Sequence, residues 1–277
     1  MTEPLPPGLY IVATPIGNLG DLSPRAADVL NRCALVLAED KRVSARLLDR
    51  SGERTPMRTY NDHSGEEERA AIVARLGGEA IALVSDAGTP LISDPGFKLV
   101  RDARAAGHLV VTIPGPCAAI AALTLAGLPT DRFLFLGFLP PKEKARAEAI
   151  DEVADIRATL VLYESGPRLA ATLLALHATL GPREAAVARE LTKFHEECVT
   201  GSLAALAARY ADVSPRGEIV VVVAPPAPPQ PTSADDLDAA LIEALASQSP
   251  SRAAASVAER LGVKRKLAYE RALKLSA

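Results

Sequence analysis

The amino-acid sequence predicts an α/β fold, and two observations lead to this prediction. Short apolar runs that are typical of strands alternate with longer helical patterns along most of the chain. Several of these runs, including Ala80–Val84 and Thr159–Tyr163, are almost entirely apolar. Strands of this kind are buried on both faces, as in sheets that carry helices on either side. Composition alone leaves open whether the chain forms two α/β domains or one doubly wound domain.

We place a first α/β domain at residues 1–116. Ser23 and Pro24 have the usual pattern of a helix start, as N-cap and first position. Ser64 and Glu67 have the spacing of a capping box before another helix. The expected strands lie at about 9–14, 35–38, 80–84 and 109–113, and the expected helices at about 24–33, 43–49, 65–76 and 97–106.

We place a second α/β domain at residues 117–224. It opens with a helix of small residues, after which strands and helices alternate again. Ser202 is expected to cap the last helix. The expected helices lie at about 117–126, 142–156, 168–180 and 203–210, and the expected strands at about 133–137, 159–163, 185–188 and 218–223.

A stiff linker at 225–231, in which five of seven residues are proline, precedes a helical module at 232–277. Ser251 is expected to cap the second helix of this module, and Gly262 to form the turn before a last helix. From Arg252 onward, seven Lys and Arg residues stand against two Glu, a net charge of +5. This helix-turn-helix-like pattern indicates RNA contact, or equally a solvated basic helix or a dimerisation strap.

The bulk composition is that of a globular protein. The 277 residues are 48% hydrophobic and carry a net charge of −3, so nucleic-acid contact would need local basic patches. The three cysteines lie far apart and the four histidines lack metal-ligand spacing, so we expect no disulfide framework and no metal. With neither a signal-peptide pattern nor an apolar run of about 18 residues, we expect a cytoplasmic protein without membrane contact.

The segment Val84–Gly96 stands out, because it joins a predicted buried strand to a predicted helix and is rich in Gly, Pro, Ser and Asp. Open α/β sheets bind ligands at such crossings, where the strands end. The segment lacks the patterns of a P-loop and of a dinucleotide-binding loop. It is therefore either a ligand-binding loop or a rigid turn, in which Asp94 merely caps the helix and Pro95 opens it.

Residues 85–96, with the sequence Ser-Asp-Ala-Gly-Thr-Pro-Leu-Ile-Ser-Asp-Pro-Gly, resemble the signature of the ribosomal RNA small-subunit methyltransferase I family. This family belongs to the tetrapyrrole-methylase superfamily. Gly166-Pro167 departs from the Pro-His that the family pattern leads us to expect, which leaves the shape of that loop open. Further matching segments keep the family's order nearly to Val223, namely Tyr10–Asp21, Ala38–Arg42, Ile113–Pro116, Leu162–Ser165 and Ala188–Lys193.

The resemblance implies two α/β domains with S-adenosylmethionine in the cleft between them, a small C-terminal helical module and a homodimer. It further implies that the substrate is the ribose 2′-hydroxyl of a cytidine in the decoding centre of small-subunit (16S) rRNA. For Tyr163, packing in the core is nearly as good an interpretation as cofactor contact. The residues implied in cofactor binding are Gly88, Thr89, Pro90, Ile92, Asp94, Ala118, Tyr163 and Ala188.

A ribose hydroxyl is a poor nucleophile until a base or a nearby cation helps to remove its proton. Two segments at the ends of predicted strands offer such groups, Glu39–Arg42 and Arg189–Lys193. Our hypothesis is that Lys193 or Lys41 lowers the pKa of the hydroxyl or takes its proton. Asp40 and Glu190 would orient these lysines, unless both segments form structural ion pairs only.

Three arginines are candidates for binding the RNA substrate, because a guanidinium can hold a phosphate through two hydrogen bonds. They are Arg42, Arg168 and Arg189. Without such a role they would be ordinary surface residues. The near-neutral chain favours the assembled ribosomal subunit over naked rRNA as the substrate.

Two other functions compete with rRNA methylation. The first is methylation of a tetrapyrrole, precorrin-like intermediate. Against it stand the form of the signature and the basic module, which an enzyme acting on a small molecule does not need. The second is a non-catalytic RNA-binding or assembly factor, although the intact Gly88, Thr89 and Pro90 favour retained cofactor binding.

Overall fold

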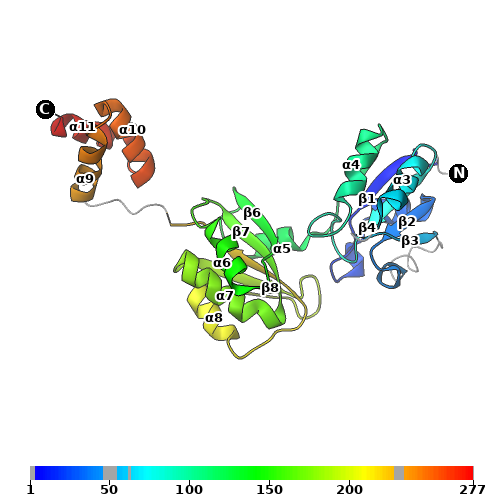
Figure 1. The fold of residues 1–277 in the computed structure, drawn as a ribbon. Coiled ribbons are helices and arrows are strands. Elements are labelled where there is room, and N and C mark those ends of the chain that lie inside the picture. Colours follow the sequence, from blue (N-terminus) through cyan, green and yellow to red (C-terminus); the bar gives the residue numbers. More distant parts are fainter. Residues whose placement is uncertain (1–3, 46–54, 62–63, 228–233, 277) are drawn as a thin grey trace. The chain divides into compact units, whose positions relative to one another are not determined.

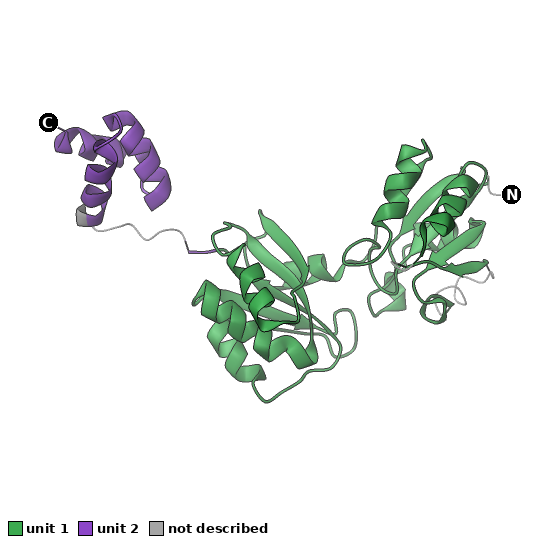
Figure 2. Ribbon diagram, viewed as in Figure 1, with its two compact units in different colours: residues 1–225 green, residues 226–277 purple. Residues whose placement is uncertain are grey.

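The computed structural model describes residues 4–45, 55–61, 64–227 and 234–276. The chain divides into two compact units, Met1–Pro225 and Pro226–Ala277, which Figure 2 distinguishes by colour. Most of the helix expected at 43–49 and most of the linker expected at 225–231 lie outside the described residues.

The first unit contains two five-stranded sheets, and several of their strands are labelled in Figure 1. Their strands are β1 (Gly8–Val12), β2 (Leu35–Ala38), β3 (Met57–Thr59), β4 (Ala80–Val84), β5 (Val110–Ile113), β6 (Phe133–Phe138), β7 (Thr159–Ser165), β8 (Glu184–Arg189), β9 (Glu197–Ser202) and β10 (Glu218–Val223). The helices of this unit are η1 (Leu19–Asp21), α1 (Pro24–Arg32), α3 (Glu66–Arg75), α4 (Phe97–Ala105), α5 (Ala118–Leu125), α6 (Glu143–Asp151), α7 (Gly166–Leu180) and α8 (Leu203–Tyr210).

The first sheet is parallel throughout and has the strand order β3-β2-β4-β1-β5. Alternate residues of β1 enter different cores, because side chains of a strand point to opposite faces. Tyr10 and Val12 pack with α1, whereas Leu9 and Ile11 pack with α3 and α4. Both faces are covered, which explains why the central strands of this sheet are so strongly apolar.

The second sheet is mixed and has the order β6-β7-β10-β8-β9, with only β6 and β7 parallel. Leu160 and Leu162 of β7 face the core formed with α6, α7 and α8. Val161 faces the opposite side, where the small-residue helix α5 packs. The chain therefore has two sheets with helices on both faces of each, as predicted. The hairpin between β8 and β9 has no helix in its connection and was not expected.

Two predicted helix caps are confirmed and two are wrong. The Ser23 and Ser202 hydroxyls accept hydrogen bonds from the backbone N–H groups of Ala26 and Ala205. The hydroxyl of Ser64 instead accepts from the N–H of Asn61 in the preceding turn, and Gly65 is the N-cap of α3. In the second unit, Pro250 takes the first helical position that its fixed φ suits, so Ser249 and not Ser251 is the N-cap.

Gly166, where the sequence departs from the family pattern, opens α7 against a neighbouring loop. A Cβ at this position would overlap the backbone carbonyl of Pro215. The departure therefore has a local cause, because this chain brings the backbone before β10 against the start of α7. Only glycine leaves room for that approach.

The second unit is a bundle of three helices, α9 (Ala234–Leu245), α10 (Pro250–Leu261) and α11 (Arg265–Leu275). Its core consists mainly of Leu and Ala side chains, with Leu241, Ala268 and Ala272 fully buried. Gly262 ends α10 in a left-handed conformation, with φ of 66°. Every helix in the described part of the chain is too short or too polar to cross a membrane.

Candidate functional site

A cavity in the first unit lies where loops at the carboxyl ends of strands from both sheets meet. Six of its lining residues are acidic and one, Lys193, is basic. The remaining lining is mostly apolar. The lining residues are Ile16, Glu39, Asp86, Ala87, Gly88, Thr89, Ile92, Ser93, Asp94, Ala118, Phe138, Tyr163, Glu164, Glu190, Leu191, Lys193, Glu218, Ile219 and Val220.

The loop after β4 forms one wall of the cavity and is tied to two neighbouring loops. Gly88 and Thr14 exchange two backbone hydrogen bonds, of 2.8 and 3.1 Å, in an isolated antiparallel bridge. The Thr89 hydroxyl donates to the carbonyl of Pro116, at 2.9 Å. Gly88 has a φ of +83°, and a Cβ there would lie 3.2 Å from Ile16 Cγ2. Glycine thus permits both the backbone conformation and the close approach of the two loops.

The same loop holds two non-glycine residues, Leu91 and Ser93, at positive φ of 72° and 64°. Such conformations cost about 1–3 kcal/mol each and tend to occur at functional sites. Gly96 is the N-cap of α4. The interpretation in which Asp94 caps this helix is therefore wrong, and its carboxyl group instead lines the cavity.

The Asp94 carboxyl is strongly affected by its surroundings. Burial raises its pKa to about 6, and the charges of Glu218 and Asp86 add to the rise, while a hydrogen bond with Ser85 opposes it. Asp94 therefore exchanges its proton near neutral pH. A cation in the cavity would favour its ionised form.

Tyr163 lies at the end of β7 and contributes an aromatic wall. Its ring meets Phe135 and Phe138 edge to face, with ring centres 4.9 and 5.5 Å apart. Burial raises the pKa of its hydroxyl, which lies near Cys117 and the Ala119 backbone. The residue both packs in the core and lines the cavity, so the two interpretations of Tyr163 are compatible.

The loop after β8 brings Lys193 and Glu190 together. The Lys193 ammonium lies 2.9 Å from Glu190 Oε1. The aliphatic stem of Lys193 passes the backbone of Gly17, where an added Cβ would lie 2.6 Å from its Cγ, and Glu190 packs similarly against Gly217. Glu190 and Thr192 have positive φ, of 51° and 65°. Loops from both sheets thus hold this ion pair in one place.

A second cavity shares Lys193 with the first. It lies on the side of Thr14, Gly17 and Ser44, and its lining also includes Asp86 and Glu218. Lys193 is therefore placed at a boundary between two spaces that could hold two ligands.

The other predicted acid and lysine are arranged differently. Asp40 pairs with Arg42 at 2.8 Å, rather than with Lys41, and this hydrogen-bonded pair lowers the pKa of Asp40 to about 2. The backbone N–H of Asp40 donates to Asp86 Oδ1, which connects this loop to the loop after β4. Lys41 is exposed, and the Arg42 side chain is 91% exposed. Neither Asp40 nor Lys41 lines the first cavity.

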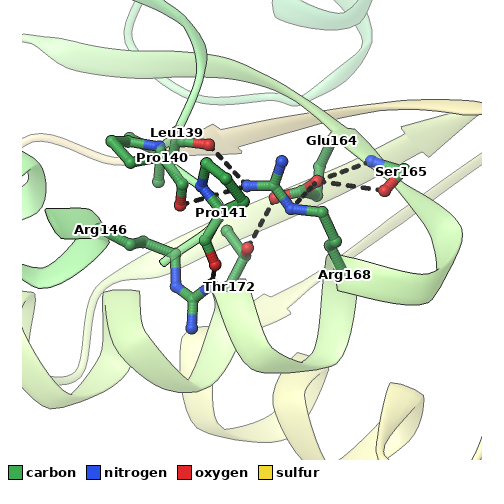
Figure 3. Close-up of polar contacts among 8 residues, drawn as sticks. All are labelled: Leu139, Pro140, Pro141, Arg146, Glu164, Ser165, Arg168 and Thr172. Carbon is green, nitrogen blue, oxygen red and sulfur yellow. Dashed lines mark hydrogen bonds and ion pairs between the residues drawn. The ribbon is translucent and has the colours of Figure 1, made fainter. Parts of the chain in front are cut away.

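Arg168 belongs to a polar network around the fully buried Glu164, which Figure 3 shows. Glu164 Oε1 accepts from the N–H of Ser165 and lies 3.2 Å from Arg168 Nε, while Oε2 accepts from the Thr172 hydroxyl at 2.6 Å. Arg168 also donates to the carbonyl of Leu139, at 2.6 Å. The network fixes the turn after Phe138, a cavity residue. Because its guanidinium is used within the fold, we assign Arg168 a structural role in place of phosphate binding.

Arg189 is likewise paired, with Glu197 on the adjacent strand β9 at 2.7 Å.

Most of the residues implied in cofactor binding line the first cavity, but Pro90 and Ala188 are buried outside its lining. Sequence reasoning missed Glu218, which opens the last strand and which only the pairing of β10 beside β7 and β8 brings to the site. It also passed over Glu39, the first residue of a segment that it had selected.

Known proteins resemble this chain over nearly its whole length. The sequence model described as Tetrapyrrole (Corrin/Porphyrin) Methylases matches residues 8–207, and the RsmI C-terminal HTH domain matches residues 231–276. A protein of Erythrobacter litoralis named ribosomal RNA small subunit methyltransferase I is 55% identical, over 99% of this chain and 97% of its own. The protein of that name from Mesorhizobium japonicum is 47% identical, over 99% and 94%.

The chain belongs to the ribosomal RNA small subunit methyltransferase I family.

Solved structures of more distant proteins share its fold. Diphthine synthase has a TM-score of 0.62 at 16% identity, and the match covers 78% of this chain and 89% of that one. Uroporphyrin-III C-methyltransferase from Thermus thermophilus, in complex with S-adenosylhomocysteine, has a TM-score of 0.55 at 19% identity, covering 78% and 97%. Each match leaves about a fifth of this chain uncovered, which is roughly the size of the second unit, Pro226–Ala277.

The network in Figure 3 leads to a prediction about stability. Glu164→Ala should lower the free energy of unfolding by about 3 kcal/mol, because it leaves Arg168 without its buried counter-charge. Thr172→Val removes a single hydrogen bond and should cost about 1 kcal/mol. Urea denaturation monitored by circular dichroism measures both values. Equal losses in the two variants would show that the ion pair contributes nothing of its own.

Proposed function

We propose that this chain transfers a methyl group from S-adenosylmethionine to the 2′-hydroxyl of a cytidine ribose in the decoding centre of small-subunit rRNA. Family membership makes it an S-adenosylmethionine-dependent methyltransferase of this rRNA. Our proposal adds the identity of the nucleotide and of the acceptor atom. The observation that supports it is Lys193, the one basic residue in the lining of each of two adjacent cavities, of which we assign one to the methyl donor and the other to the acceptor hydroxyl.

The chemistry of the first cavity fits S-adenosylmethionine. Its sulfonium and ammonium groups are cationic, and the cavity has six carboxylates against one lysine. Gly88 lines the cavity without a side chain, so a ligand could approach its backbone closely. Asp94 would hold a cationic group, and Ile92, Ala118 and Tyr163 would contact its apolar parts. The cofactor supplies an already activated methyl group, so the protein's task is to position the acceptor and manage charge.

Lys193 and Glu190 are the residues that act on the acceptor. The Lys193 ammonium would donate to the ribose oxygen and lower the pKa of the hydroxyl, because a nearby cation stabilises the developing alkoxide. The hydroxyl proton would leave to water as the S–CH3 bond of the donor breaks and the O–CH3 bond forms. Glu190, 2.9 Å away, orients the ammonium. Lys41 is exposed at the start of the helical segment that follows β2 and Arg42 has 91% of its side chain exposed, so we assign them, with Asp40 fixing Arg42, to contact with RNA phosphates.

The proposed reaction also raises the questions of which form of the rRNA is the substrate and in which oligomeric state the protein acts. We propose that the assembled small subunit is the substrate, since a chain of net charge −3 has little sequence-blind affinity for RNA. The basic C-terminal module would add local affinity. We further propose a cytoplasmic homodimer. The high identity of the rRNA methyltransferases over nearly the full chain favours this function over tetrapyrrole methylation.

The test uses labelled S-adenosylmethionine with small ribosomal subunits from a strain that lacks this protein. Nuclease digestion and mass spectrometry then locate the label. We expect one labelled cytidine ribose per subunit. Label on a base, or none on subunits while a tetrapyrrole precursor is methylated, would refute the proposal. Binding of S-adenosylmethionine without transfer to either acceptor would favour the non-catalytic factor.

The role of Lys193 leads to a prediction about rate. Lys193→Met should lower kcat on small subunits by about 100-fold or more, the usual contribution of a positioned group that assists proton removal. Binding of S-adenosylmethionine, measured by calorimetry, should change only a few-fold. Lys144→Met is the matched control, because Lys144 is 90% exposed on α6. A rate within threefold of the wild type would remove Lys193 from the mechanism.

The raised pKa of Asp94 leads to a prediction about pH. The carboxyl group is protonated below about pH 6, and only its ionised form attracts a cation. Binding therefore has to remove a proton at low pH, so the Kd for S-adenosylmethionine should be roughly tenfold higher at pH 5 than at pH 7. Asp94→Asn should bind more weakly at pH 7 and show a flat profile. Calorimetric titration across this range distinguishes the two. The same slope in the variant would place the titrating group elsewhere.

A further inference from the structure

Phe194 is almost entirely exposed, although it lies in the loop that carries Lys193. Its side chain is 96% exposed, more than that of any other large apolar residue in the described part of the chain. Among the other phenylalanines, Phe97 follows at 68% and Phe138 at 53%. An exposed apolar residue is common in itself. An aromatic ring fully in solvent, one residue from the proposed catalytic lysine, is a more specific feature.

The exposure is imposed by a well-bonded turn. The N–H of Lys193 donates to the Glu190 carbonyl at 3.0 Å, and the N–H of Glu196 donates to the Lys193 carbonyl at 3.2 Å. The Glu196 carboxylate accepts from the N–H of Thr192 at 2.6 Å. Together with the positive φ of Glu190 and Thr192, these bonds set the course of the backbone on both sides of Phe194. The ring therefore projects outward from an ordered turn.

The turn that carries Phe194 also carries Lys193, which we propose acts on the acceptor hydroxyl. Adjacent Cα atoms are about 3.8 Å apart. The Lys193 side chain, which is 40% exposed, passes Gly17 and lines the cavities, while Phe194 points to solvent. On the proposed function, a nucleotide whose ribose reaches Lys193 from solvent would approach the turn that carries this ring. The His195 ring meets Phe194 edge to face, with ring centres 5.0 Å apart.

We propose that Phe194 stacks on the base of the acceptor nucleotide and so positions its ribose at Lys193. This inference rests on the proposed function. Single-stranded RNA bases are commonly bound by stacking on aromatic side chains, because every base presents a flat π-face. Only 4% of the residues of this chain are aromatic, and it contains no Trp, so few other rings are available for this contact.

The proposal distinguishes an aromatic contact from an apolar one. Removing one stacking ring typically lowers affinity by about 10- to 100-fold. Phe194→Ala and Phe194→Leu should both raise KM for small subunits by this amount, because Leu is apolar but offers no flat face. Phe194→Trp should keep nearly the wild-type KM. Affinity for S-adenosylmethionine should stay unchanged in all three variants, since Phe194 does not line the cavity.

The experiment measures kcat and KM of these variants on small subunits, together with the sedimentation coefficient of each protein. Phe133→Ala is the control, because Phe133 is 45% exposed at the start of β6, at the opposite end of the strand from the cavity residue Phe138. We expect wild-type kinetics for this control. A wild-type protein that does not methylate subunits would defeat the proposed function and not only the stacking.

With an active wild type, three results would overturn the stacking role. Phe194→Ala could keep the wild-type KM. Phe194→Leu could keep it while Phe194→Ala loses it, which would indicate a merely apolar contact. Finally, the loss of activity could coincide with dissociation of a dimer, which would show that a second copy of the chain covers the ring.

Discussion

The candidate site depends on the exchange of two backbone hydrogen bonds between Thr14 and Gly88. This bridge joins the loop after β1 to the loop after β4, and the Thr89 hydroxyl extends the tie to the loop after β5. Three adjacent strands of a parallel sheet therefore end in loops that cannot move independently. The N–H of Asp40 adds the loop after β2 through Asp86. The cavity wall is fixed mainly by main-chain groups, so much of its shape is independent of side-chain identity.

The second domain meets this wall through a different kind of contact. The stem of Lys193 packs against Gly17 and the carboxylate of Glu190 against Gly217, and the two charged groups form an ion pair. The buried Glu164 network lies behind Tyr163 and Phe138, and it fixes the aromatic side of the cavity. The first domain thus supplies a wall rich in backbone groups, whereas the second supplies the aromatic rings and the lysine, and each domain contributes three of the six acidic side chains. Both are needed for a site that binds a donor and an acceptor together.

Much of the fold could be predicted from the sequence, because strands buried on both faces leave continuous apolar runs and short motifs identify the family. Local signals were less dependable where two of them competed. Ser64 and Ser251 have cap-like positions, yet Gly65 and Pro250 determine the actual helix starts. The hairpin to β9 was missed because Glu197–Ser202 has little apolar alternation. For the site, motifs identified the loops, but Glu218 and the Glu164 network arise from strand pairing, which leaves no local pattern.

Four residues that are not glycine adopt left-handed backbone conformations in the two loops of the site, namely Leu91, Ser93, Glu190 and Thr192. At each of these positions glycine would relieve strain. Selection for thermal stability would therefore favour substitutions that remove the side chains from these loops, while selection for activity would keep them. If a relative were engineered for thermal stability alone, glycine substitutions at these positions would be among the first to reduce its activity. At these four positions the fold gives up some stability to keep the loop conformations of the site.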